Sequence, residues 1–292
     1  MRVLLLPLLL SVAALAAPSC ESLATKGLTN GAVTIATLIA PGAFPAPPGR
    51  GPNSGPAYRK LPAFCRVAAT LKPSSDSQIR IEVWLPAGGW NGKLQAVGNG
   101  AWAGTISYPA MATALAAGYA TASTDTGHEG NNPDFIAGHP EKVKDFAWRA
   151  VHEMTVASKA IVAAYYEDNA KYAYWNGCST GGRQAMAEAQ RFPTDYDGII
   201  AGAPASYVTH LQGAQVWISA IAHKDEAGYI PPEKYAAIHK AVLEQCDALD
   251  GVKDGVIENP RACKFDPKVL HCQGADGPAC LTPAQVDVAR QI

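Results

Sequence analysis

The chain lacks an excess of charge of either sign. Its 292 residues include 24 Lys and Arg against 25 Asp and Glu, for a formal net charge of −1. Binding to nucleic acid or to an anionic membrane surface through charge needs a basic excess, so the balance supports neither partner. It favours partners that are small and uncharged or weakly anionic. With 48% hydrophobic residues, the chain can build a sizeable core in one or two domains.

Long hydrophobic runs are missing outside the N-terminus. One apolar run follows Arg2, covers residues 3–10 and leads into small residues. This pattern predicts a secretory signal peptide over residues 1–17. The run is too short to cross about 30 Å of hydrocarbon as an anchor, and residues 17–19 are a poor lead-in to a lipoprotein acceptor at Cys20. We therefore expect a secreted protein, extracellular or periplasmic.

Export makes the seven cysteines informative, because oxidising compartments favour disulfides. Two pairs are close in the sequence and would each close a small loop, and a third pair lies near the mature N-terminus. The predicted disulfides are Cys246–Cys263, Cys272–Cys280 and Cys20–Cys65. Cys178 is left over, so it is either a small buried side chain or bonded to a cysteine outside this chain.

Between residues 79 and 201, short apolar segments alternate with helical patterns. Strands are expected at 79–85, 93–97, 119–123, 172–176 and 198–201, and helices at about 109–117, 143–166 and 183–191. This alternation predicts an α/β fold with a parallel sheet and crossover helices. After about Ser206 no clear strand is found, cysteines cluster and Asp-Gly turns recur, which indicates a domain boundary.

The strongest functional signal is Gly177-Cys-Ser-Thr-Gly181, between a predicted strand and a predicted helix. In a G-x-S-x-G nucleophile elbow the serine occupies a sharp, strained turn, and small neighbours let strand and helix pack closely. Ser179 is the predicted nucleophile, and the backbone N–H of Thr180 points to where an oxyanion would form. The alternative is a glycine-rich turn that needs tight geometry and carries no chemistry.

A second oxyanion donor is expected from the loop Gly98-Asn-Gly-Ala101, which follows a core strand. A catalytic acid and a histidine should follow the serine along the chain. None of the downstream histidines ends a predicted core strand: His210, His223, His239 and His271. Asp195 and Asp197 follow the nucleophile helix too closely to be the acid, and His128 is expected to be structural. The triad is therefore incomplete within these residues.

A third group of residues can hold a metal ion. Between Cys246 and Val256, closely spaced aspartates alternate with Asp-Gly turns. Carboxylates and backbone carbonyls in such a loop are ligands for Ca²⁺, although Asp-Gly pairs are also ordinary turn formers. The Cys246–Cys263 disulfide would close this loop, which favours calcium.

Together these motifs resemble the tannase and feruloyl esterase family, which includes the mono(2-hydroxyethyl) terephthalate hydrolases. The resemblance runs from about Ser19 to the end of the chain and is most specific in Gly177-Cys-Ser-Thr-Gly-Gly-Arg-Gln184. The other matching stretches are Trp90–Gly100, Thr124–His128, Ala189–Pro193, Tyr196–Ile199, Gly202–Pro204 and Cys246–Val256.

The resemblance implies an α/β-hydrolase with a large lid domain inserted after the strand that follows the nucleophile helix. It assigns residues 18–205 to the N-terminal part of the hydrolase domain and 206–292 to the start of the lid. It places the oxyanion hole at the backbone amides of Gly100 and Thr180. It also implies a structural Ca²⁺ site in the lid, held by the side chains of Asp247, Asp250 and Asp254 and the carbonyls of Val252 and Val256.

Family members continue well past Ile292, and the resemblance implies that their catalytic acid and histidine lie there. It also implies a disulfide from Cys178 to a cysteine beside that histidine. We expect this chain to be truncated and inactive or poorly folded alone. The complete protein would be a secreted serine esterase acting on esters of aromatic acids, of feruloyl esterase or tannase type. The alternatives are a mono(2-hydroxyethyl) terephthalate-type hydrolase, a secreted peptidase and a non-catalytic binding protein on the same fold.

Overall fold

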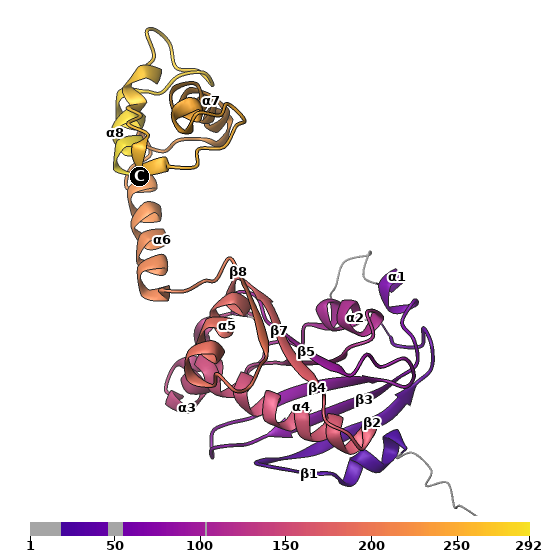
Figure 1. The fold of residues 1–292 in the computed structure, drawn as a ribbon. Coiled ribbons are helices and arrows are strands. Elements are labelled where there is room, and N and C mark those ends of the chain that lie inside the picture. The colour runs from indigo at the N-terminus through magenta and orange to yellow at the C-terminus, as the bar shows by residue number, and fades with distance from the viewer. Residues whose placement is uncertain (1–18, 46–54, 103) are drawn as a thin grey trace, which may run out of the picture. The chain divides into compact units, whose positions relative to one another are not determined.

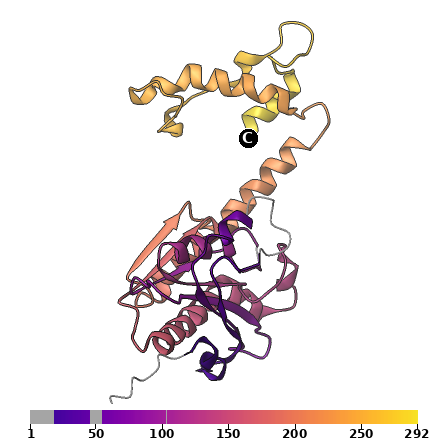
Figure 2. The same cartoon turned by 90° about the vertical axis from the view of Figure 1, so that its right-hand side faces the viewer.

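The computed structural model describes residues 19–45, 55–102 and 104–292, and the predicted signal peptide lies outside them. The chain divides into two compact units, Met1–Ser206 and Tyr207–Ile292. The first unit is a β-sheet with helices packed on it, and the second consists of helices and long loops (Figures 1 and 2).

In its described residues, the first unit contains one mixed sheet with the strand order β1-β2-β3-β4-β6-β5-β7-β8. The strands are β1 (Gly27–Leu28), β2 (Gly31–Ile39), β3 (Phe64–Leu71), β4 (Ile79–Pro86), β5 (Lys93–Val97), β6 (Ala120–Thr124), β7 (Tyr172–Cys178) and β8 (Gly198–Gly202). Pairing is antiparallel from β1 to β4 and between β4 and β6, and parallel through β6, β5, β7 and β8.

The antiparallel half departs from the parallel pairing predicted from the sequence, and strand 79–85 belongs to it. Strands β2, β3 and β4 follow one another without crossover helices, with Cys65 opposite Leu85 in the β3–β4 pair. A register shift between Val33 and Ile35 interrupts the regular alternation of β2, as expected for a bulge. Strand β2 precedes the segment in which the sequence pattern predicts strands.

Two apolar clusters cover the two faces of the sheet. Successive residues of a strand point to opposite faces, and in β4 the residues Ile81 and Val83 join one cluster while Trp84 joins the other. Helices α4 (Ala150–Tyr166) and α5 (Thr180–Arg191) pack on the first face, and α2 (Tyr108–Ala116) on the second (Figure 1).

The helix predicted from 143 to 166 is interrupted near its start. Helix α3 (Pro140–Lys144) runs into a π-helical turn at Asp145–Arg149, which continues as α4. The other helical segments of this unit are the 3₁₀ turns Cys20–Thr25 and Pro133–Ile136 and the short helix α1 (Gly55–Tyr58). A π turn is a single wide turn that often accompanies a functional feature.

The second unit, all of whose residues are described, has no strand. Its helices are α6 (Val208–Ala222), α7 (Tyr235–Cys246) and α8 (Pro283–Gln291), with 3₁₀ turns at Pro232–Lys234, Asp247–Asp250, Pro260–Ala262 and Pro267–Leu270. A small core joins them: Ile221, Ile230, Leu281, Val286 and Val288. Across the described parts of both units, every helix is too short or too polar to cross a membrane.

Candidate active site

Ser179 forms the turn between β7 and α5, as the nucleophile-elbow pattern predicts. Its φ of 59° and ψ of −117° are strained for a residue with a side chain. Both of its backbone groups are bonded: the N–H donates to the Gly202 carbonyl over 3.0 Å, and the carbonyl accepts from Arg183 and Ala205 over 3.0 and 2.9 Å. Helix α5 and the end of β8 thus hold the strained turn, and Ser179 is exposed at its tip.

The glycines around the elbow have no room for a side chain. A Cβ on Gly177 would lie 2.4 Å from the Gly181 carbonyl oxygen. One on Gly182 would lie 2.4 Å from the Gly202 oxygen, and one on Gly98 would lie 2.5 Å from Gly181 Cα. The sequence needs glycine here because β7, α5 and the loop after β5 meet backbone to backbone.

The loop after β5 lies against the first turn of α5. Strands β5 and β7 are parallel neighbours, so their carboxyl ends meet at one edge of the sheet. The Gly181 N–H donates to the Asn99 carbonyl, and the Thr180 hydroxyl donates to the Ala101 carbonyl, each over 2.8 Å. These two bonds lie on either side of Gly100 and fix its peptide beside Ser179.

The two predicted oxyanion donors remain available. Thr180 is the first residue of α5, where an N–H has no partner within the helix. In the part of the chain that the structure describes, neither this N–H nor that of Gly100 donates a hydrogen bond. Two free N–H groups beside an exposed serine are the arrangement that stabilises an oxyanion in acyl transfer.

A buried pair of amides holds the loop in place. The Asn99 N–H donates to Gln184 Oε1 over 3.1 Å, and Gln184 Nε2 donates back to Asn99 Oδ1 over 3.0 Å. The Asn99 amide also donates to the carbonyls of Thr105 and Thr124. Gln184 belongs to the specific Cys178–Gln184 stretch, but a lone amide in a sequence gives no signal of its partner.

His128 is structural, as expected from its position. Its Nε2 donates to the Trp102 carbonyl over 2.7 Å, and its Nδ1 lies 3.2 Å from Thr126 Oγ1. The ring stacks on Phe135 with centroids 3.6 Å apart. Burial lowers the pKa of His128 from its ordinary value. It fastens the far end of the loop that carries Gly100.

Arg183 fastens the nucleophile helix to the π turn. Its guanidinium donates to the carbonyls of Ala147 and Phe146 over 2.9 and 3.2 Å and lies 4.9 Å from the centre of the Phe146 ring. The π turn supplies these carbonyls, since a widened turn leaves them free for an outside donor. The role of Arg183 could not be predicted from the sequence.

Within the described residues of the first unit, no acid or histidine is hydrogen-bonded to the Ser179 hydroxyl. None of their hydrogen bonds involves the Ser179 hydroxyl, and the four downstream histidines all belong to the second unit. Asp195 is paired with His152 at 2.7 Å, and Asp197 accepts the Ala173 N–H at 2.7 Å. The described residues of the first unit thus bring together the candidate nucleophile and the candidate oxyanion donors.

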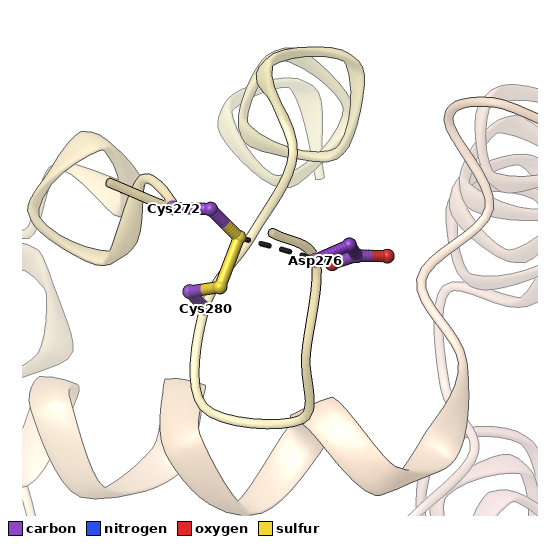
Figure 3. Close-up of side chains that lie close together, drawn as sticks. All are labelled: Cys272, Asp276 and Cys280. Atoms are coloured by element: carbon purple, nitrogen blue, oxygen red, sulfur yellow. Dashed lines mark hydrogen bonds between the residues drawn. A yellow bond between two sulfur atoms is a disulfide. The ribbon is translucent and has the colours of Figure 1, made fainter. Parts of the chain in front are cut away.

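The cysteines form the disulfides Cys20–Cys65, Cys246–Cys263 and Cys272–Cys280. Cys178 is free and exposed, so its interpretation as a buried small side chain is wrong. Figure 3 shows Asp276 beside the Cys272–Cys280 disulfide, 3.8 Å from the Cys272 sulfur. Sulfurs bonded to each other are not thiolates, so this group does not bind a metal.

The predicted calcium ligands lie in one loop of the second unit. Asp247 Oδ1 accepts the Gly255 N–H, and the carboxylates of Asp250 and Asp254 accept the N–H groups of Val252 and Val256. The second oxygen of Asp250 accepts the Glu258 N–H over 3.3 Å. Carboxylate and carbonyl oxygens of this kind are ligands for a hard cation such as Ca²⁺. In the described structure, the three carboxylates do not bring one oxygen each within 4.8 Å of the others.

Comparison with known proteins identifies relatives of most of the chain. The family model of tannase and feruloyl esterase matches residues 65–292. An uncharacterised esterase of Xanthomonas campestris pv. campestris is 42% identical over 279 residues, 95% of this chain and 47% of the relative. A protein of Aspergillus fumigatus named "Probable feruloyl esterase B-1" is 36% identical over 232 residues, 78% of this chain and 44% of the relative.

A solved structure agrees with these matches. The crystal structure of feruloyl esterase B from Aspergillus oryzae superposes with a TM-score of 0.80 at 35% identity, covering 93% of this chain and 54% of that one. The chain spans about half the length of the curated relatives it matches. Its mixed sheet and flanking helices are those of an α/β-hydrolase. The chain belongs to the tannase and feruloyl esterase family.

Proposed function

We propose that the complete protein is a secreted serine esterase that hydrolyses esters of aromatic acids, of feruloyl esterase or tannase type. The observation that carries this is the strained Ser179 elbow beside two free N–H groups, those of Gly100 and Thr180. The names of the relatives, an esterase and feruloyl esterases, support the reaction and the substrate class.

The proposed reaction proceeds through an acyl-enzyme. Ser179 Oγ attacks the ester carbonyl carbon while a histidine outside these residues accepts the hydroxyl proton. The carbonyl electron pair moves onto oxygen, where the N–H groups of Gly100 and Thr180 hold it; losing one such donor typically costs about 10²–10³ in kcat. The intermediate expels the alcohol, which takes the proton from the histidine. Water then attacks the acyl-enzyme carbonyl while the histidine accepts its proton. The proton returns to Ser179 Oγ as the aromatic acid is released.

The proposal includes a disulfide outside the described pairs. The exposed thiol of Cys178 adjoins Ser179 and has no partner among the described cysteines. A bond from Cys178 to a cysteine beside the catalytic histidine would hold base and nucleophile together. Peptide mapping of the non-reduced complete protein should recover Cys178 in a disulfide-linked peptide, whereas an alkylated Cys178 would contradict this part of the proposal.

We also propose a structural role for calcium. Asp247, Asp250 and Asp254, with the carbonyls of Val252 and Val256, would hold the ion and stiffen their loop. Calcium should raise the melting temperature of the complete protein, and Asp250→Asn should abolish the increase. An equal response in both proteins would exclude this site.

Hydrolysis by the complete protein tests the function directly. Methyl ferulate, methyl gallate, chlorogenate and mono(2-hydroxyethyl) terephthalate distinguish the substrate types, and a fluorophosphonate probe labels an activated serine. We expect hydrolysis of phenolic esters and labelling, both abolished by Ser179→Ala and unaffected by Ser206→Ala, whose exposed side chain makes only a local contact. A folded protein that neither reacts with the probe nor hydrolyses any ester would be a binding protein, and the proposal would fall.

A further inference from the structure

Three side chains able to bind a metal converge on the helical side of the sheet, apart from Ser179. They are His152 on α4, Glu188 on α5 and Asp195 in the loop before β8. One ligating atom from each lies within 4.8 Å of the others. His152 Nδ1 is already 2.7 Å from Asp195 Oδ2. Three separate segments of the chain therefore deliver donors to one point.

Glu188 is the unusual member of this group. Its side chain is completely buried, and neither carboxylate oxygen has a hydrogen-bond donor among the described residues. Its neighbour in the cluster is Asp195, a second carboxylate. A buried carboxylate without a donor or a cation is costly. A cation held between the two carboxylates would offset this cost.

We propose that His152, Glu188 and Asp195 bind a divalent transition-metal ion of the zinc type. One imidazole nitrogen and two carboxylates form a mixed donor set that zinc accepts, leaving a fourth position for water. Donor atoms around tetrahedral zinc lie roughly 3.4 Å apart, since each bond is about 2.0–2.2 Å long. The observed atoms, within 4.8 Å of one another, would need to shift by only about 1 Å to reach that spacing.

The surroundings suit a bound ion. The side chains of His152 and Asp195 are 29% and 12% exposed, so an ion and its water can enter from the surface, with Glu188 at the base. The Phe192 ring stacks on the imidazole of His152 with centroids 3.8 Å apart and fixes its orientation. Preorganised ligands of this kind lower the entropic cost of binding.

A shared proton is the competing account. Two carboxyl groups in contact can share one proton, so a protonated Glu188 could donate to Asp195 while Asp195 accepts from His152. That arrangement needs no metal and predicts no zinc affinity that depends on Glu188. The two accounts therefore differ in a measurable quantity.

Zinc titration of the complete protein separates them. Free thiols are alkylated, metals are removed with a chelator, calcium is restored in excess, and ZnCl₂ binding is followed by calorimetry. We expect one zinc ion to depend on this site. Glu188→Gln should weaken its binding at least about tenfold, because removal even of residues that only support metal ligands costs about 10–100-fold. His139→Asn is the matched control, because His139 forms an exposed pair with Asp76.

Zinc should raise the melting temperature of the unmodified protein and of His139→Asn but not of Glu188→Gln. Equal zinc affinity with and without the Glu188 carboxylate would overturn the proposal. So would a Glu188→Gln protein of higher stability and an unmodified protein that ignores zinc, because both fit a shared proton. If Glu188→Gln does not fold, Asp195→Asn gives the same comparison. No turnover is measured, so failure here leaves the proposed esterase function untouched.

Discussion

Gly98 is where the loop after β5 approaches the nucleophile helix most closely, so Gly98→Ala tests the packing beneath the candidate site. The new Cβ would lie 2.5 Å from Gly181 Cα, 3.1 Å from Trp175 Cζ2 and 3.2 Å from Gln184 Oε1. The nearest atom belongs to a backbone and Trp175 is fully buried. No flexible side chain can move to relieve the first contact.

The expected cost is at the upper end of ordinary overpacking, about 3 kcal/mol of unfolding free energy. For a unit of this size that corresponds to a fall of about 6–12 °C in melting temperature. Gly100→Ala is the matched control: its Cβ would have no atom within 4 Å and its φ is not positive. It should change the unfolding free energy by less than about 0.5 kcal/mol while keeping the Gly100 N–H.

Calorimetric melting of the complete protein measures both variants. Gly181→Ala should fall between them, because its Cβ would meet its closest atom at 3.1 Å. Equal melting temperatures for the Gly98 and Gly100 variants, or a greater loss at Gly100, would refute the close packing that we infer at this edge of the sheet.

Three other predictions follow from named contacts. Burial raises the pKa of Asp125 to about 7, so the folded state holds this proton more firmly than the unfolded chain. The resulting contribution to the unfolding free energy, up to about 4 kcal/mol, is complete below about pH 4 and lost as pH rises through 7. Urea unfolding at a series of pH values should show this decline. Asp125→Asn cannot titrate, so its unfolding free energy should decline less over the same pH range. Gln184→Met removes both bonds to Asn99 and leaves the Asn99 N–H without a partner, which should cost about 2–4 kcal/mol in urea unfolding; an unchanged midpoint would mean the pair is inert. Replacing Cys20 and Cys65 by Ala opens a disulfide that spans 45 residues, and melting should reveal a loss of about 4 kcal/mol, whereas unchanged melting would contradict this.

The parallel part of the sheet could be predicted from the sequence because its strands are short apolar runs bounded by loops. The antiparallel part could not, and β3 shows why. From Cys65 onward its burial alternates, with Val67, Ala69 and Leu71 buried and Ala68 and Thr70 half-buried. Alanine stands on both faces, so the buried and open positions do not differ enough in polarity for the period to be visible.

The elbow could be predicted because its geometry depends on neighbours in the sequence. A serine between glycines, at a strand-to-helix junction, is enough to specify the strained turn. The residues that hold the other half of the site are distant from one another along the chain. Asn99 and Gln184 are separated by 85 residues, and no local pattern reveals which amide meets which.

The cluster of His152, Glu188 and Asp195 illustrates the same limit for buried charge. In the sequence, Glu188 stands on the polar side of a helix pattern that ends at Arg191, and nothing distinguishes it from a solvated glutamate. Only the packing of α5 against α4 shows that its carboxylate is buried without a donor. Whether a buried carboxyl group has a hydrogen-bond partner depends on the assembled fold, so only the structure reveals it.

The strain at Ser179 is held entirely by residues of the first unit. A serine with φ of 59° needs its neighbours to fix it, and those neighbours are Gly202, Arg183 and Ala205, all within the first unit. The Gly100 peptide is fixed by bonds from Gly181 and Thr180, which belong to the same helix as the elbow. Nucleophile and oxyanion donors are therefore set by one rigid piece of sheet and helix. Under the proposed function, a base would therefore meet a serine whose backbone is already fixed.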